Sequence, residues 1–143
     1  MGGWLSFMDT VRVYQLSKEG FQCAQILMIH ALEIEDSKNA DLVRAAGGLN
    51  ASFSNTAGPC GALTGGCCFL SYFSGKGDDT EIEDPAFKAM LSEFTHWFRA
   101  EYGSQICIEI LGGDIKNMPV RCPGIILAVY AKTTKILEEN DVI

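Results

Sequence analysis

Residues 21–35, FQCAQILMIHALEIE, are the segment that most limits what this chain can fold into. On a helix of this sequence, apolar side chains lie nearly all the way round, so no face is suited to solvent. Other elements must therefore cover such a helix on every side. We expect it to be the central, buried helix of the fold.

A second segment, CGALTGGCCFLSYF at 60–73, is also predicted to be a buried helix, although it contains Gly61, Gly65 and Gly66. Each glycine inside a helix costs roughly 1 kcal/mol relative to alanine. Glycine also lets a neighbour approach the backbone closely. That neighbour can be another helix or an inorganic cluster, and the sequence alone leaves both open.

Helical periodicity continues through the rest of the chain, and no long alternation of β-branched and polar residues predicts a strand. We therefore predict an all-α, compact bundle of six or seven helices that forms one domain over residues 1–143. Two further helices are expected at 8–18 and at 38–46, the second with Ser37 as its N-cap. Another is opened by Asp84 and Pro85 and closed by Gly103. A short helix at 105–112 is capped by Ser104, and a long helix begins at Pro123.

Charge and hydropathy exclude several classes of protein. The net charge is −7 and the 11 basic residues are scattered, which argues against nucleic acid and against anionic lipid as partners. No apolar run reaches the roughly 18 residues of a membrane span. The first residues lack the pattern of a secretory signal, so we expect a cytoplasmic protein. In a reducing compartment, cysteines are more often metal ligands, redox thiols or core residues than structural bridges.

Six cysteines lie at positions 23, 60, 67, 68, 107 and 122, and none forms a Cys-x-x-Cys pair. Cys60 follows a proline at a predicted helix start, where the helix dipole is expected to lower the pKa of a thiol. Cys122 precedes Pro123 in the same way and is the expected N-cap of the last helix. Small apolar packing is an equal alternative for both. Cys23, expected in mid-helix, and Cys107 are by themselves interpreted as core residues.

The other candidate ligands give weaker signals. Cys67 and Cys68 are adjacent, and an adjacent pair rarely bonds to itself, so we assign them no role. His30 lies seven residues after Cys23 and on the same helical face, which makes it a candidate further ligand. A buried core histidine is the commoner arrangement. His96 lies off the apolar face of its helix and is expected to be solvated.

Four elements, FQCAQ, CGALTGG, QICIEILG and VRCPG, follow one another in the order found in a known family. Together they resemble the C_GCAxxG_C_C family of redox-active proteins, and LVRAAGGL upstream of the glycine element is similar as well. The resemblance spans the chain from Cys23 to Cys122. It implies a site of four cysteines, Cys23, Cys60, Cys107 and Cys122, that is redox-active or binds an iron–sulfur cluster.

These observations support three hypotheses. The first is a small electron-transfer protein in which the four cysteines bind an iron–sulfur cluster and Gly61 and Gly65 allow the cluster to approach the backbone. The second is a thiol–disulfide protein in which Cys60 attacks. The third is a helical interaction module, with structural zinc or no metal. Whether the protein is an enzyme stays open. We expect an unidentified redox partner protein, and a homodimer because two such apolar helices exceed what one small bundle easily covers.

Overall fold

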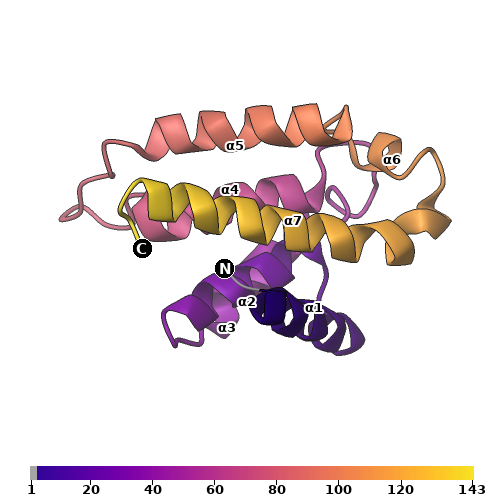
Figure 1. Cartoon of the computed structure of the whole chain (residues 1–143), viewed down its shortest axis with the longest axis horizontal. Helices are drawn as coiled ribbons and strands as arrows, with labels where there is room; N and C mark the ends of the chain where they lie inside the picture. Colours follow the sequence, from indigo (N-terminus) through magenta and orange to yellow (C-terminus); the bar gives the residue numbers. More distant parts are fainter. Residues whose placement is uncertain (1–2) are drawn as a thin grey trace.

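Nine helical segments build the protein in the computed structural model, which describes residues 3–143 (Figure 1). The α-helices are α1 (Gly3–Lys18), α2 (Cys23–Ile34), α3 (Ala40–Ala46), α4 (Gly61–Ser74), α5 (Phe87–Tyr102), α6 (Cys107–Ile110) and α7 (Met118–Glu139); short 3₁₀ segments are η1 (Gly47–Leu49) and η2 (Ile115–Asn117). Within residues 3–143 no strand forms, and one isolated bridge joins Pro59 to Ile106. The all-α prediction is confirmed.

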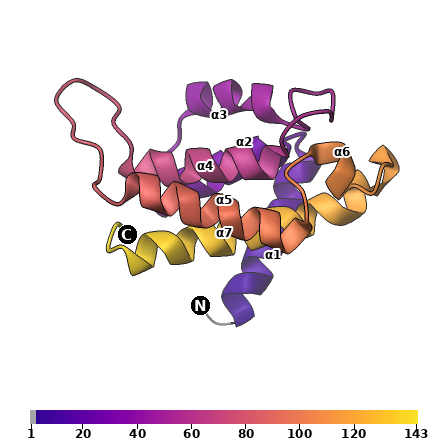
Figure 2. The same cartoon turned by 90° about the horizontal axis from the view of Figure 1, so that it is seen from above.

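Helix α4 lies at the centre of the bundle. It packs against α2 on one side and against α5 and α7 on the other, with α3 beyond α2 (Figures 1 and 2). Helix α1 packs mainly against α7 and also contacts α2. Much of the apolar surface of α2 and α4 is thus covered within one chain, and Leu27, Phe69 and Leu70 are fully buried.

Two of the α4 glycines are explained by helix packing. A β-carbon at Gly65 would lie 2.9 Å from the Cα of Ala24 in α2. A β-carbon at Gly66 would overlap the ring of Phe94 in α5 and lie 2.8 Å from Cγ1 of Val129 in α7. Heavy atoms never pack this closely, so the absence of a side chain lets three helices approach α4.

The amphipathic patterns of the last two long helices predict their inner faces. For α5 the predicted apolar residues are Phe87, Met90, Leu91, Phe94, Phe98 and Tyr102. Met90, Phe94 and Phe98 are buried, and the other three are half-buried. In α7 the buried residues include all six that the sequence places on the inner face: Ile125, Ile126, Val129, Thr133, Ile136 and Leu137. No helix in the described part of the chain is long and apolar enough to cross a lipid bilayer.

The prediction that Ser37 caps the third helix is wrong. The amide of Ser37 donates to the carbonyl of Leu32, and Asp36, with a φ of 51°, donates to Glu33. This pair of bonds is the Schellman motif that ends α2. The N-cap of α3 is Asn39, whose side chain accepts a hydrogen bond from the amide of Leu42 at 3.1 Å.

Three other helix starts also differ from expectation. Helix α7 begins at Met118 rather than Pro123, which lies inside it, and Pro119 occupies the first turn. Helix α5 begins at Phe87, because the carboxylate of Asp84 binds the amide of Ala86 within the preceding turn. Helix α6 has Ile106 as its N-cap, and Ser104 accepts from the amide of that residue.

Candidate functional site

The four cysteines of the sequence motif line one cavity of about 430 Å³. Cys23 comes from α2, Cys60 from the start of α4, Cys107 from α6 and Cys122 from α7. The remaining wall is mostly apolar. It is formed by Val13, Tyr14, Ser17 and Lys18 of α1, by Phe21, Gln22, Ile26, Ala51, Gly61 and Ala62, and by Met118, Pro119, Pro123, Ile125 and Ile126 of α7.

Three of these cysteines stand at the N-termini of helices. Cys60 is the N-cap of α4, as the sequence predicts. Cys23 and Cys107 are each the first residue of a helix, α2 and α6 respectively, so the mid-helix position expected for Cys23 is wrong. Unpaired amide groups are exposed at helix starts. The helices that carry these cysteines therefore direct amide groups and the positive ends of their dipoles toward one region.

A short antiparallel pairing holds Cys60 beside Cys107. The amide of Cys60 donates to the carbonyl of Gln105 at 2.7 Å, and the amide of Cys107 donates to Gly58 at 2.8 Å. In such a ladder, residue 60 faces residue 105, and residue 107 is its diagonal neighbour on the same face. The connection before α4 is thereby fixed to the connection before α6.

The start of α2 is capped by a residue from a distant loop. The side-chain oxygen of Asn50 accepts from the amides of Ala24 at 3.0 Å and Gln25 at 3.4 Å. Its amide nitrogen donates to the side chain of Gln25 at 3.0 Å. Because Asn50 is buried and satisfies both amides, it fixes the position of the helix end that carries Cys23.

The residues after Asn50 form a left-handed turn that contacts the site. Ala51, Ser52, Phe53 and Ser54 have φ values between 50° and 63°. Left-handed helical geometry costs roughly 1–2 kcal/mol for each non-glycine residue. The turn brings the amide of Ala51 to the sulfur of Cys23. Strained backbone next to a cavity is characteristic of functional sites. The sequence predicts only a polar loop here.

Gly61 differs from Gly65 and Gly66, because the side chain that packs against it is that of a cysteine, Cys23. A β-carbon at Gly61 would overlap the sulfur of Cys23 and lie 2.8 Å from the carbonyl oxygen of Leu49. Gly61 lines the cavity, whereas Gly65 packs against α2 and is not among the lining residues. The close approach of Cys23 to the start of α4 therefore requires glycine at position 61.

Cys122 is not a helix cap. It is the fifth residue of α7, and the ring of Pro123 follows it inside the helix. Proline lacks an amide hydrogen, so position 123 cannot donate to the carbonyl of Pro119 four residues earlier. The sequence places this helix start five residues too late, at Pro123 instead of Met118, because Pro119 and Pro123 both match the pattern of a proline in a first helical turn.

Burial controls the acidity of the four thiols. It raises the pKa of Cys60 to about 11, although the amides of Ala62 and Leu63 act in the opposite direction without completing a capping hydrogen bond. Burial, with the nearby Cys23, Cys60 and Cys107, raises the pKa of Cys122 to about 12. The pKa values of Cys23 and Cys107 are also raised, in both cases mainly by burial. The prediction that the helix dipole gives Cys60 a lowered pKa is wrong, because desolvation outweighs it.

The other candidate ligands lie elsewhere. Cys67 and Cys68 are half-buried in α4 and do not line the four-cysteine cavity. Cys68 instead lines a separate apolar cavity with Leu42 and Tyr72. His30 is buried against the ring of Tyr130, with ring centroids 4.7 Å apart, and it is not in the cavity wall either.

His30 makes stability depend on pH. Burial lowers its pKa to about 4, and its Nε2 atom has no hydrogen-bond partner among the described residues. Below pH 6.5 the unfolded chain binds a proton that the folded chain refuses until about pH 4. Stability is therefore present at neutral pH and lost as the pH falls through this window. From pH 7 to pH 4.5 we expect a loss of about 2–3 kcal/mol from this residue.

Urea unfolding at both pH values measures this loss. His30→Phe should flatten the pH dependence by that amount. An equal pH dependence in the wild type and His30→Phe would contradict the assignment to His30.

All six cysteines are free thiols. Within residues 3–143, no three histidine, cysteine or acidic side chains gather closely enough to hold one metal ion. The four cysteines surround an open volume instead of converging on a point.

Comparison with known proteins gives one match. No curated protein and no solved structure matches the chain. The sequence model of the family described as "Putative redox-active protein (C_GCAxxG_C_C)" matches residues 21–136. This range includes Cys23, Cys60, Cys107 and Cys122 and leaves out the whole of α1. The chain belongs to the C_GCAxxG_C_C family of redox-active proteins.

Proposed function

We propose that this protein transfers electrons through an iron–sulfur cluster held by Cys23, Cys60, Cys107 and Cys122. The observation that carries the proposal is that these four side chains, separated by up to 99 residues in sequence, line one cavity. Membership of a redox-active family supports the same chemistry.

The chemistry of the donors fits a cluster better than it fits zinc. Four thiolates are the usual ligand set of a [2Fe–2S] or [4Fe–4S] cluster. A single zinc ion needs its sulfur ligands about 2.3 Å away, which requires a compact group of thiols. A cluster distributes its ligands over several irons and occupies volume between them. The cavity of about 430 Å³ that the four cysteines line supports this proposal.

The surroundings of the cysteines suit a ligand that carries negative charge. When bound, the cluster supplies one-electron transfer. The amides of Ala51, Ala24, Ala62 and Leu63 approach the sulfurs of Cys23 and Cys60, where they stabilise thiolate charge. The raised pKa values mean that the free thiols are protonated at neutral pH, so cluster binding must release protons.

The thiol–disulfide alternative is less well supported. A thiolate is the attacking species, and burial keeps all four thiols protonated at neutral pH. The four thiols do share one cavity, which favours pairing among them once any one is oxidised. The test below therefore includes this outcome.

Anaerobic purification followed by a visible spectrum with iron and acid-labile sulfide analysis tests the proposal. We expect sulfur-to-iron charge-transfer absorption, with iron and sulfide in comparable amounts. Zinc without sulfide would establish the structural alternative. A metal-free protein whose thiols pair reversibly would establish the thiol–disulfide alternative, and both results would overturn the proposal.

The redox partner and the homodimer stay predictions. Most apolar side chains of α2 and α4 are buried within one chain, whereas Ile29, Cys67, Cys68, Tyr72 and Phe73 are half-buried and Ile34 is 39% exposed. Light scattering of the anaerobic protein measures the oligomeric state directly.

A further inference from the structure

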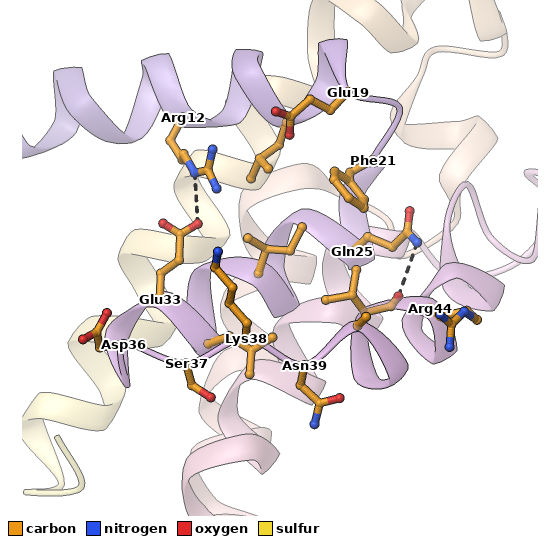
Figure 3. Close-up of a pocket in the computed structure, with 15 residues that line it drawn as sticks. Arg12, Glu19, Phe21, Gln25, Glu33, Asp36, Ser37, Lys38, Asn39 and Arg44 are labelled. Atoms are coloured by element: carbon orange, nitrogen blue, oxygen red, sulfur yellow. Dashed lines mark hydrogen bonds and ion pairs between the residues drawn. The ribbon is translucent and has the colours of Figure 1, made fainter.

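A groove of about 940 Å³ lies outside the four-cysteine cavity (Figure 3). We call it the α1–α2 groove. It lies between α1, α2 and the connection from α2 through the start of α3. Its apolar lining consists of Leu16, Phe21, Ile29, Leu32 and Val43. An apolar base with a few polar groups around it is the usual composition of a ligand site.

Of the six charged residues that line the groove, Arg12, Glu33 and Arg44 are paired, and Glu19, Asp36 and Lys38 have no ion-pair partner among the described residues. Arg12 of α1 donates to Glu33 of α2 at 2.9 Å, which closes one end of the groove. Arg44 binds Asp41 at 2.7 Å. At the other end, Gln25 donates to the carbonyl of Val43 at 3.3 Å, beside the ring of Phe21.

Two opposite charges on the rim have no partner. The side chains of Glu19 and Lys38 make no ion pair or hydrogen bond with any described residue. Glu19 projects from α1, and Lys38 extends up from the facing wall across the opening (Figure 3). Asp36, also unpaired, lies at the outer edge beyond Glu33. The groove thus has an anion, Glu19, on one wall and a cation, Lys38, on the opposite wall, with an apolar base between them.

From this charge pattern we propose that the α1–α2 groove binds a short zwitterionic peptide with apolar side chains. Its ammonium group pairs with Glu19, its carboxylate pairs with Lys38, and its side chains cover the half-buried Phe21 and Ile29. The volume is near the upper end of the 300–1,000 Å³ usual for ligand sites, which suits a few residues rather than one amino acid.

Other ligands leave one of the two charges unpaired. A fatty acid satisfies Lys38 but brings its chain past an unpaired Glu19. An apolar amine does the reverse, with Lys38 left unsatisfied. A ligand that leaves Glu19 or Lys38 unpaired is expected to bind more weakly than one that pairs with both, and this difference would select a zwitterionic ligand. This proposal is independent of the cofactor, because among the residues that line the two cavities only Phe21 lines both.

Isothermal titration with trileucine tests the proposal on the full chain. Trileucine should bind, and Lys38→Met or Glu19→Gln should each weaken it about three- to fivefold, as expected for one rim ion pair. C-terminally amidated trileucine should bind more weakly to the wild type and be insensitive to Lys38→Met. Likewise, N-acetylated trileucine should bind more weakly than trileucine to the wild type, and Glu19→Gln should not change its affinity.

Matched variants separate this site from general effects. Lys76→Met removes a lysine that does not line the groove and should leave trileucine binding unchanged. Cys60→Ser should also leave it unchanged, which keeps this result separate from the presence of a cluster. The proposal is overturned if trileucine does not bind, or if the blocked peptides bind as tightly as trileucine. It is also overturned if sodium dodecanoate is the only one of these ligands that binds.

Discussion

Cys60→Ser should reduce the iron and sulfide bound per chain at least tenfold while the helical circular dichroism stays unchanged. Cys60 lines the cavity and is the N-cap of α4. Serine has nearly the same size and is among the best N-cap residues, so the helix has no reason to unfold. It offers no thiolate, however, and a cluster that loses one of four ligands is bound far less tightly. Iron and sulfide analysis of the anaerobic protein gives the result.

Cys67→Ala is the matched control for this experiment, since Cys67 lies in the same helix but outside the cavity wall. It should cost about 1 kcal/mol of stability through lost packing and leave the iron content unchanged. Equal loss of iron in both variants would show that the cavity is not the site.

Gly66→Val should lower the free energy of unfolding by about 3 kcal/mol or more, because of overpacking against α5 and α7. The first added carbon would already overlap the ring of Phe94 and lie 2.8 Å from Cγ1 of Val129. Phe94 and Val129 are fully buried, so neither can move into solvent. A loss of this size is a large share of the 5–15 kcal/mol that stabilises a typical domain. Urea unfolding measures it.

Gly124→Ala provides a control of opposite sign. Gly124 lies inside α7, and a β-carbon there would have no heavy atom within 4 Å. Alanine should therefore stabilise the protein, by about 0.5–1 kcal/mol, through its higher helix propensity. Destabilisation by Gly124→Ala, or no change in Gly66→Val, would contradict the packing described for these helices.

The sequence predicts the bundle well because helix burial depends on local periodicity. The 3.6-residue pattern identifies α5 and α7, and the wholly apolar segments identify α2 and α4 as central. Helix starts are predicted less well, since they depend on which of several nearby polar or proline residues is used. Ser37 and Asn39 are both good caps, and only the end of α2 decides between them.

The candidate site is predicted only in part, for a related reason. The cysteines can be selected from the motif, but the residue that caps the helix of Cys23 is Asn50, 26 positions away from Ala24. The pairing of Cys60 with Gln105 and the left-handed turn at 51–54 likewise arise from contacts between distant segments. The strong burial that raises the thiol pKa values is also a property of the assembled fold.

The contribution of one cysteine from each of four helices has a consequence for biosynthesis. Cys122 lies 99 residues after Cys23, so the ribosome must complete most of the chain before the last of the four thiols emerges. A nascent chain that ends before α7 contains three of the four cysteines that line the cavity and lacks the part of the wall that Ile125 and Ile126 form. We therefore expect that any cofactor bound by these four cysteines can be held only after the chain through α7 has been made.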